Sequence, residues 1–168
     1  MVINAEVLDK ALSSASAEEG PRIYLSPRGI KFDQAFAKDL SKEQGAIFIC
    51  GRYEGVDERF LIYNNVIEVS VGDFILSGGE IGAQLMIDAT VRLLPNVIGN
   101  SIGLVEESFE NNLLEYPLYT YPRVWNELEV PEVLLSGDHK RIKKWKTEMS
   151  EKLTKSKRPD LWSKYIKS

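Results

Sequence analysis

Three short loops hold the residues of this sequence that are best suited to binding a ligand. They span residues 26–29, 51–55 and 72–79, and each contains at least one glycine. Glycine has no side chain, so it lets the backbone approach a ligand closely. Tyr24 and Tyr53 lie beside or within two of these loops and could offer ring surfaces. We expect the loops to bind a ligand through backbone amides, backbone carbonyls and aromatic rings.

The sequence lacks the motifs of common nucleotide and metal sites. It contains neither G-x-G-x-x-G nor G-x-x-x-x-G-K-[ST], so neither a dinucleotide fold nor a P-loop is predicted. The single histidine, His139, leaves little for imidazole chemistry, and no Cys/His cluster predicts zinc. The loops therefore suit a neutral or zwitterionic ligand with an adenine ring better than a triphosphate, and we expect no metal site.

The elements that must position these loops alternate between two patterns. Runs of β-forming residues precede the loops, at 23–25, 46–50 and 66–71, and a short further run, 74–76, lies within the third loop. Helical spacing of apolar residues covers 1–17, 32–40 and 81–94, with Asn4 as a cap and Asp33 in the first turn of the second helix. This alternation predicts a parallel α/β sheet covered by helices, whose strands end at the edge where open sheets bind ligands.

Charge is divided unevenly between the two ends of the chain. Residues 138–168 carry eleven Lys and Arg against four Asp and Glu, a net charge of +7. Residues 1–137 carry ten against twenty-one, a net charge of −11, and the two sum to −4. A basic helix with Ile142, Trp145 and Met149 on one face suggests a polyanion partner, bound through Lys140, Arg141, Lys143, Lys144 and Lys146. Charge alone favours the alternative, a solvated lysine-rich helix face.

The length and composition favour one buried core with room for a small second domain. No apolar stretch reaches the ~18 residues that span a bilayer, and the N-terminus lacks a signal-peptide pattern. Cys50 is the single cysteine, and its apolar surroundings predict a buried, reduced thiol. We therefore expect a cytoplasmic protein that does not enter a membrane.

Four motifs of the chain resemble those of a known enzyme family. Residues 24–29, 50–59, 72–80 and 130–139, with the basic helix that contains Trp145, are similar to the bacterial tRNA (guanine-N1)-methyltransferases, the TrmD family. The resemblance implies a SPOUT-type α/β fold, a parallel sheet with a deep C-terminal trefoil knot, followed by a small helical domain. It divides the chain into a cofactor-binding domain at 1–98, a linker at 99–112 and a basic tRNA-binding domain at 113–168.

The same resemblance implies a reaction and a cofactor. The family transfers methyl from S-adenosylmethionine to N1 of the guanosine immediately 3′ of the tRNA anticodon, position 37. Its members are homodimers with sites shared across subunits, and Mg²⁺ is a further implied cofactor. The matching positions assign to S-adenosylmethionine Tyr24, Leu25, Ser26, Pro27, Gly29, Gly51, Tyr53, Glu54, Gly55, Val71, Gly72, Leu76, Gly78 and Gly79.

Two more positions match residues with catalytic roles in the family. Arg92 falls on an arginine that stabilises negative charge on the guanine oxygen. Without the resemblance, an ordinary Asp88–Arg92 ion pair would be the preferred interpretation. Glu107 aligns with an aspartate proposed as the base, which one subunit supplies to the cofactor of its partner. The alternative is that Glu106 and Glu107 are solvated loop acids.

The chain also departs from the family pattern. Family chains begin earlier, with a strand, a helix and a glycine-rich loop that contacts the target nucleotide, so we expect a shortened member. Residues 118–122 read Leu-Tyr-Thr-Tyr-Pro where the family often has His-Tyr-Thr-Arg-Pro. Three alternatives follow: an impaired fragment that binds only S-adenosylmethionine, a methyltransferase acting on different RNA, and a structural RNA-binding module built on residues 138–168.

Overall fold

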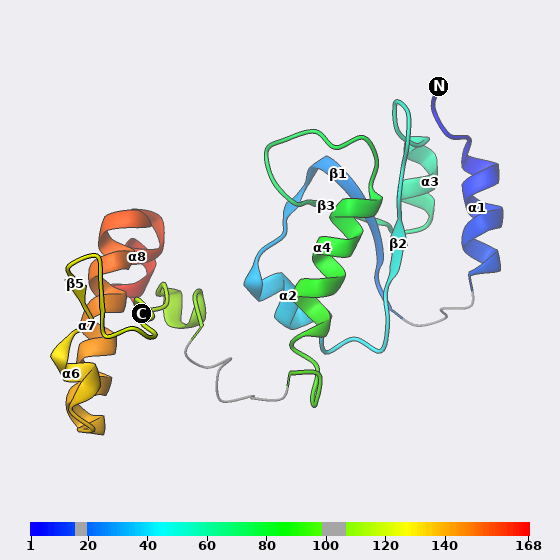
Figure 1. Ribbon diagram of the computed structural model, residues 1–168. Helices are drawn as coiled ribbons and strands as arrows, with labels where there is room; N and C mark the ends of the chain where they lie inside the picture. Colours follow the sequence, from blue (N-terminus) through cyan, green and yellow to red (C-terminus); the bar gives the residue numbers. More distant parts are fainter. Residues whose placement is uncertain (16–19, 99–106) are drawn as a thin grey trace. The chain divides into compact units, whose positions relative to one another are not determined.

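The computed structural model describes residues 1–15, 20–98 and 107–168. The chain divides into two compact units, Met1–Gly99 and Asn100–Ser168 (Figure 1). The first unit contains a sheet covered by helices, and the second consists mainly of helices. Each unit is described by itself.

A three-stranded parallel sheet forms the centre of the first unit. Its strands are β1 (Arg22–Lys31), β2 (Ile47–Ile49) and β3 (Ile67–Ser70), in the order β2-β1-β3. Tyr24 of β1 pairs with Ile49 on one side and with Glu68 on the other. The predicted α/β class with a parallel sheet is therefore confirmed.

Helices cover both faces of this sheet (Figure 1). They are α1 (Ala5–Ser14), α2 (Gln34–Leu40), α3 (Glu58–Tyr63) and α4 (Glu80–Val91). Neighbouring residues of a strand point to opposite faces, so Ile23 packs with Leu40 and Met86 of α2 and α4. Tyr24 packs with Phe60 of α3 and with apolar residues of α1. The core therefore lies in two layers, one on each side of the sheet.

Side-chain caps fix where three of these helices begin. Asn4 accepts a hydrogen bond from the Glu6 amide at 2.8 Å, and Asp33 accepts one from the Phe36 amide at 3.0 Å. Asp57 caps α3 in the same way. Such caps satisfy amides that have no partner inside the helix. Helix α4 has no side-chain cap and begins directly after Gly79, at the end of the 72–79 loop.

The structure differs from the sequence-based prediction at two places. Residues 74–76 do not form a strand; they belong to an irregular loop in which Ile75 is 81% exposed. A β-forming run needs a neighbouring strand to pair with, and none lies beside this one among the described residues. Helix α3 at residues 58–63, for which the sequence predicted no element, forms because Asp57 caps it and Phe60 and Leu61 are buried.

The second unit contains the basic helix predicted after Asp138. The elements are η1 (Glu110–Asn112), β4 (Val124–Trp125), β5 (Leu128–Glu129), α6 (Glu132–Leu135), α7 (His139–Lys157) and α8 (Pro159–Tyr165). Asp138 caps α7, and Leu161 of α8 is buried. Of the expected linker, 99–106 lies outside the described residues, whereas η1 contacts α8. No helix in the described ranges is long and apolar enough to cross a membrane.

Candidate active site

A cavity of about 320 Å³ opens at the carboxyl edge of the sheet. Its wall comes from the three loops singled out in the sequence: 26–27 within β1, 51–55 after β2, and 71–79 after β3. Gly82, in the first turn of α4, completes the wall. Because the strands are parallel, loops that lie far apart in the sequence meet at this edge.

The loop at 26–29 is an excursion from the middle of β1. Val69 of β3 pairs with both Leu25 and Ile30, so the four residues between them leave the ladder. The excursion closes at Gly29, where any Cβ atom would collide with the backbone of Glu68 and Val69. Gly29 therefore lies against β3 and is not among the residues that line the cavity.

The 51–55 and 72–79 loops contact each other through their backbones. The Gly79 amide donates a hydrogen bond to the Gly51 carbonyl at 3.2 Å. A Cβ atom at Gly79 would lie 2.9 Å from Cys50 Cα, so the two chains touch through their backbones. Beside this contact, the Arg52 guanidinium lies 2.7 Å from the Glu80 carboxylate. The backbone amide of Glu80, followed by Arg52, lowers the pKa of that carboxyl.

The two tyrosines play different parts in this wall. Tyr24 is 9% exposed, and a Cβ atom at Gly51 would lie 2.7 Å from its ring. Burial raises the pKa of the Tyr24 hydroxyl, so the ring is an uncharged, fixed surface. Tyr53 is 72% exposed and sits at the rim. The N-terminal segment supports this loop, since the Ile3 amide donates to the Gly55 carbonyl at 2.9 Å.

Most of the predicted cofactor residues meet in this one cavity. Those that line it are Tyr24, Leu25, Ser26, Pro27, Gly51, Tyr53, Glu54, Gly55, Val71, Gly72, Leu76, Gly78 and Gly79. Sequence reasoning missed Arg52, Val69, Ser70, Phe74, Ile75, Ser77 and Gly82, which line it as well. Most of these sit inside the loops or at a strand end, and their position beside the predicted residues was an available signal.

The wall offers mainly apolar surface and backbone groups. Its charged side chains are Arg52, paired with Glu80, and Glu54, which is exposed. Six glycines leave main-chain amides and carbonyls accessible at close range. Such a cavity can take a ring and an aliphatic chain, and its lining includes one side chain of each charge.

Neither candidate catalytic residue lines this cavity. Arg92 is the C-cap of α4, twelve residues after Glu80, which places it about 18 Å along the helix axis from the cavity end. A second cavity of about 280 Å³ lies near that end and is lined by Ile87, Thr90 and Leu94. Glu107 belongs to the second unit. Glu106 lies outside the described residues.

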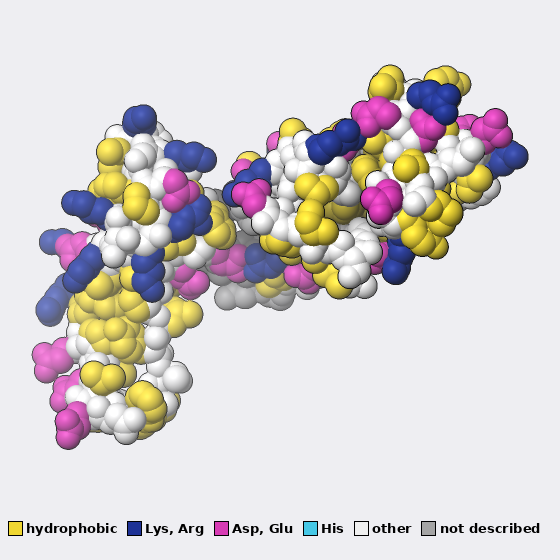
Figure 2. All heavy atoms as spheres, turned by 90° about the horizontal axis from the view of Figure 1, so that it is seen from above, with side chains coloured by type: hydrophobic (Ala, Val, Ile, Leu, Met, Phe, Trp, Pro, Cys, Tyr) yellow, Lys and Arg dark blue, Asp and Glu magenta, His cyan; other side chains and the backbone are white. Residues whose placement is uncertain are grey.

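The basic residues predicted to bind a polyanion all lie on α7. Lys140, Arg141, Lys143 and Lys144 are exposed, and Lys146 is half-buried with its ammonium 4.4 Å from the centre of the Tyr116 ring. Figure 2 shows Lys and Arg side chains gathered over the helical unit at the left of the view. This surface can contact phosphate groups.

The fold and cavity define an α/β protein with a cavity at the carboxyl edge of a parallel sheet. The family model described as tRNA (Guanine-1)-methyltransferase TrmD matches residues 1–164. A tRNA (guanine-N(1)-)-methyltransferase of Pelagibacter ubique (strain HTCC1062) is 54% identical over 169 residues, which cover 100% of this chain and 74% of the relative. The enzyme of that name from Rhodospirillum rubrum is 47% identical, covering 99% of this chain and 70% of the relative. The chain belongs to the TrmD family, as its motifs predicted.

Proposed function

We propose that this chain transfers a methyl group from S-adenosylmethionine to N1 of the guanosine immediately 3′ of the tRNA anticodon. Family membership supports the reaction. The observation that carries the proposal for this chain is the cavity of about 320 Å³ that unites three separate glycine-bearing loops. Its size falls within the range of small-molecule sites, about 300–1,000 Å³.

The residues of the cavity fit S-adenosylmethionine. Gly51 and Gly79 sit where a Cβ atom would collide with Tyr24 or Cys50, so the wall is shaped by backbone. The buried Tyr24 ring and the apolar side chains suit the adenosine part, while Arg52 and Glu54 carry charges opposite to those of the methionine carboxylate and ammonium. Bound there, S-adenosylmethionine would supply a methyl group on a positively charged sulfur.

Two side chains complete the proposed chemistry. N1 of neutral guanine carries a hydrogen, so methylation requires a base, and we assign this role to Glu107. Loss of that proton moves negative charge to the guanine oxygen, which Arg92 would stabilise.

A homodimer with shared sites would bring Arg92 to a cavity. Within one chain, Arg92 stands at the opposite end of α4 from the cavity. Ile81 and Leu85 of α4 are 65% and 45% exposed and lie one turn apart on one face of the helix, an apolar surface that a second copy could cover. The proposal also includes the trefoil knot, which family membership supports.

The resemblance also implies Mg²⁺. The described residues contain no group of three or more His, Cys, Asp or Glu side chains that could hold a metal ion. We therefore assign no step and no ligand to Mg²⁺.

We expect tRNA binding to weaken steeply with salt, because Lys and Arg that contact phosphates release counterions. The logarithm of the affinity should fall linearly with the logarithm of the salt concentration. Replacing Lys140, Arg141, Lys143 or Lys144 with alanine should each reduce this slope by about 0.9. Filter binding across a salt series measures the slope. Lys10→Ala, a change at an exposed residue of α1, is the control and should leave the slope unchanged. An affinity that does not depend on salt would show that these basic residues form a solvated helix face and do not contact phosphates.

Calorimetric titration of S-adenosylmethionine into the chain tests the cofactor assignment. We expect saturable binding. Its absence would favour a structural RNA-binding module, in which the basic second unit is the functional part.

A further inference from the structure

The excursion at residues 26–29 requires something to hold it in place. Residues 26–29 have no partner in the sheet ladder, although Ser26 and Pro27 line the cavity. Within the excursion, the Arg28 amide donates to Ser26 Oγ at 3.2 Å. A single local hydrogen bond of this kind contributes little to stability and does not fix where the excursion lies relative to other loops.

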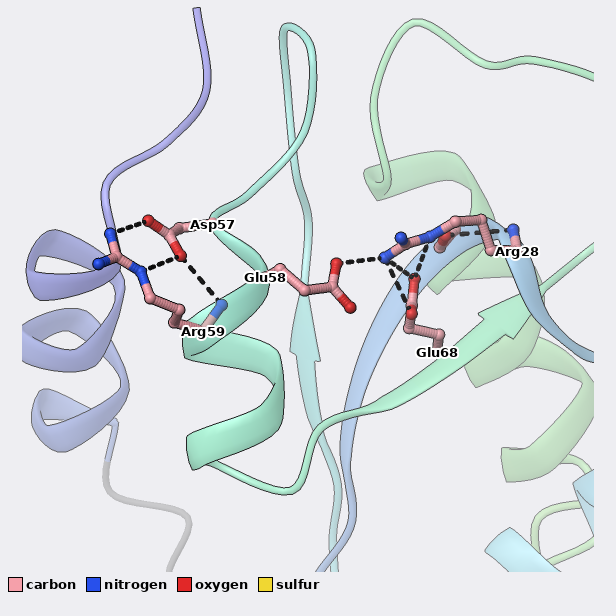
Figure 3. A network of polar contacts seen from close by, with 6 residues as sticks. Arg28, Asp57, Glu58, Arg59 and Glu68 are labelled. Carbon is pink, nitrogen blue, oxygen red and sulfur yellow. Dashed lines mark hydrogen bonds and ion pairs between the residues drawn. The ribbon is translucent and has the colours of Figure 1, made fainter.

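The Arg28 side chain supplies the missing long-range contacts. Its Nε lies 3.2 Å from Glu68 Oε2, and its Nη2 lies 3.0 Å from the same oxygen. The same Nη2 donates to Glu58 Oε2 at 2.8 Å. Figure 3 shows the Arg28 guanidinium between the two carboxylates, one from β3 and one from α3. Arg28 therefore joins three elements.

These contacts connect two walls of the cavity. Glu58 is the first residue of α3 and lies three positions after Gly55, the end of the 51–55 loop. Arg28 lies next to Pro27 in the opposite wall. We propose that Arg28, held by Glu58 and Glu68, is a positioning residue that sets the 26–27 wall against the 51–55 wall so that S-adenosylmethionine fits between them. This inference rests on the proposed function.

The energetics favour a local role over a role in global stability. The side chains of Arg28 and Glu58 are 59% and 56% exposed, so solvent screens their attraction and the pair adds little to folding. However, the guanidinium connects the excursion to both α3 and β3, so its loss releases the excursion from both elements. The excursion would then occupy the binding arrangement for a smaller fraction of the time. The apparent affinity for S-adenosylmethionine would fall in proportion to that fraction.

The test measures S-adenosylmethionine affinity by calorimetry and methyl transfer to tRNA at saturating cofactor, on the whole chain. Arg28→Gln should raise the Kd about five- to tenfold, with kcat and the unfolding temperature nearly unchanged. Arg28→Lys, which keeps the charge but loses the fork, should give a smaller rise. Glu58→Gln alone should also raise the Kd, and adding it to Arg28→Gln should cost little further affinity, because the bridge between the two residues is already lost.

Arg59→Gln is the matched control. Arg59 lies on the same turn of α3 and pairs with Asp57 at 2.7 Å, away from the excursion (Figure 3). It should bind the cofactor like the unaltered chain.

Three results would overturn the inference. These are an unchanged Kd in folded Arg28→Gln, a double variant whose loss of affinity equals the product of the two single losses, and an equal loss in Arg59→Gln. If Arg28→Gln does not fold, the inference is tested with Arg28→Lys and Glu58→Gln. An unchanged affinity for S-adenosylmethionine in both variants would overturn the inference. A chain that binds no S-adenosylmethionine before any substitution would instead overturn the proposed function, and the inference with it.

Discussion

Glu107→Gln should slow methyl transfer to tRNA about 10²–10⁴-fold, the usual contribution of a positioned general base. The amide is close in size to the carboxylate but cannot take the proton that leaves guanine N1. Because the substitution removes only the base, the affinity for S-adenosylmethionine should not change. Single-turnover transfer of radiolabelled methyl measures the first quantity and calorimetry measures the second.

Glu107→Asp is the control for this prediction. It restores the family's residue at the aligned position and keeps a carboxylate, so it should retain most of the activity. Transfer by Glu107→Gln at the rate of the unaltered chain would show that the base lies elsewhere. Glu106 and Glu54 would then be the next carboxylates to replace.

Gly79→Val should abolish binding of S-adenosylmethionine. Its Cβ atom would lie 2.9 Å from Cys50 Cα and 3.4 Å from the Gly51 amide nitrogen, so the backbones of two cavity loops would have to separate. The φ angle of Gly79 is −76°, which valine can adopt, so the effect arises from the contact and not from backbone strain. Calorimetry measures the binding, and circular dichroism checks that the variant folds.

Gly78→Ala provides a graded comparison for Gly79→Val. The closest group to a Cβ atom at Gly78 is the end of the Glu80 side chain, which can turn away at the cost of its ion pair with Arg52. We therefore expect weaker binding in Gly78→Ala and none in Gly79→Val. Equal affinity of a folded Gly79→Val and the unaltered chain would remove the 72–79 loop from the site.

Local patterns predicted much of the first unit because local chemistry determines it. Asn4 and Asp33 accept hydrogen bonds from the first amides of their helices, and this depends on only a few neighbouring residues. The run at 74–76 misled the prediction, because its β-forming residues are exposed on a loop. Strand formation depends on a pairing partner that the run itself does not specify.

The parts that sequence patterns could not predict depend on distant contacts. The excursion at 26–29 exists because Val69 pairs with both Leu25 and Ile30, more than thirty-five residues away. Arg28 was not predicted as a site residue, since its partners Glu58 and Glu68 stand 30 and 40 positions further along the chain. Alignment with a family gave roles to Arg92 and Glu107, but within one chain Arg92 stands far from the cavity end of α4.

Methyl transfer to a defined tRNA tests the central claim most directly. Two unmodified transcripts that differ only in guanosine or adenosine immediately 3′ of the anticodon would be incubated with the chain and radiolabelled S-adenosylmethionine. Digestion to nucleosides then identifies the labelled product. The account predicts labelled 1-methylguanosine from the guanosine transcript and no label from the other. No label in either transcript, or label in a different nucleoside, would contradict it.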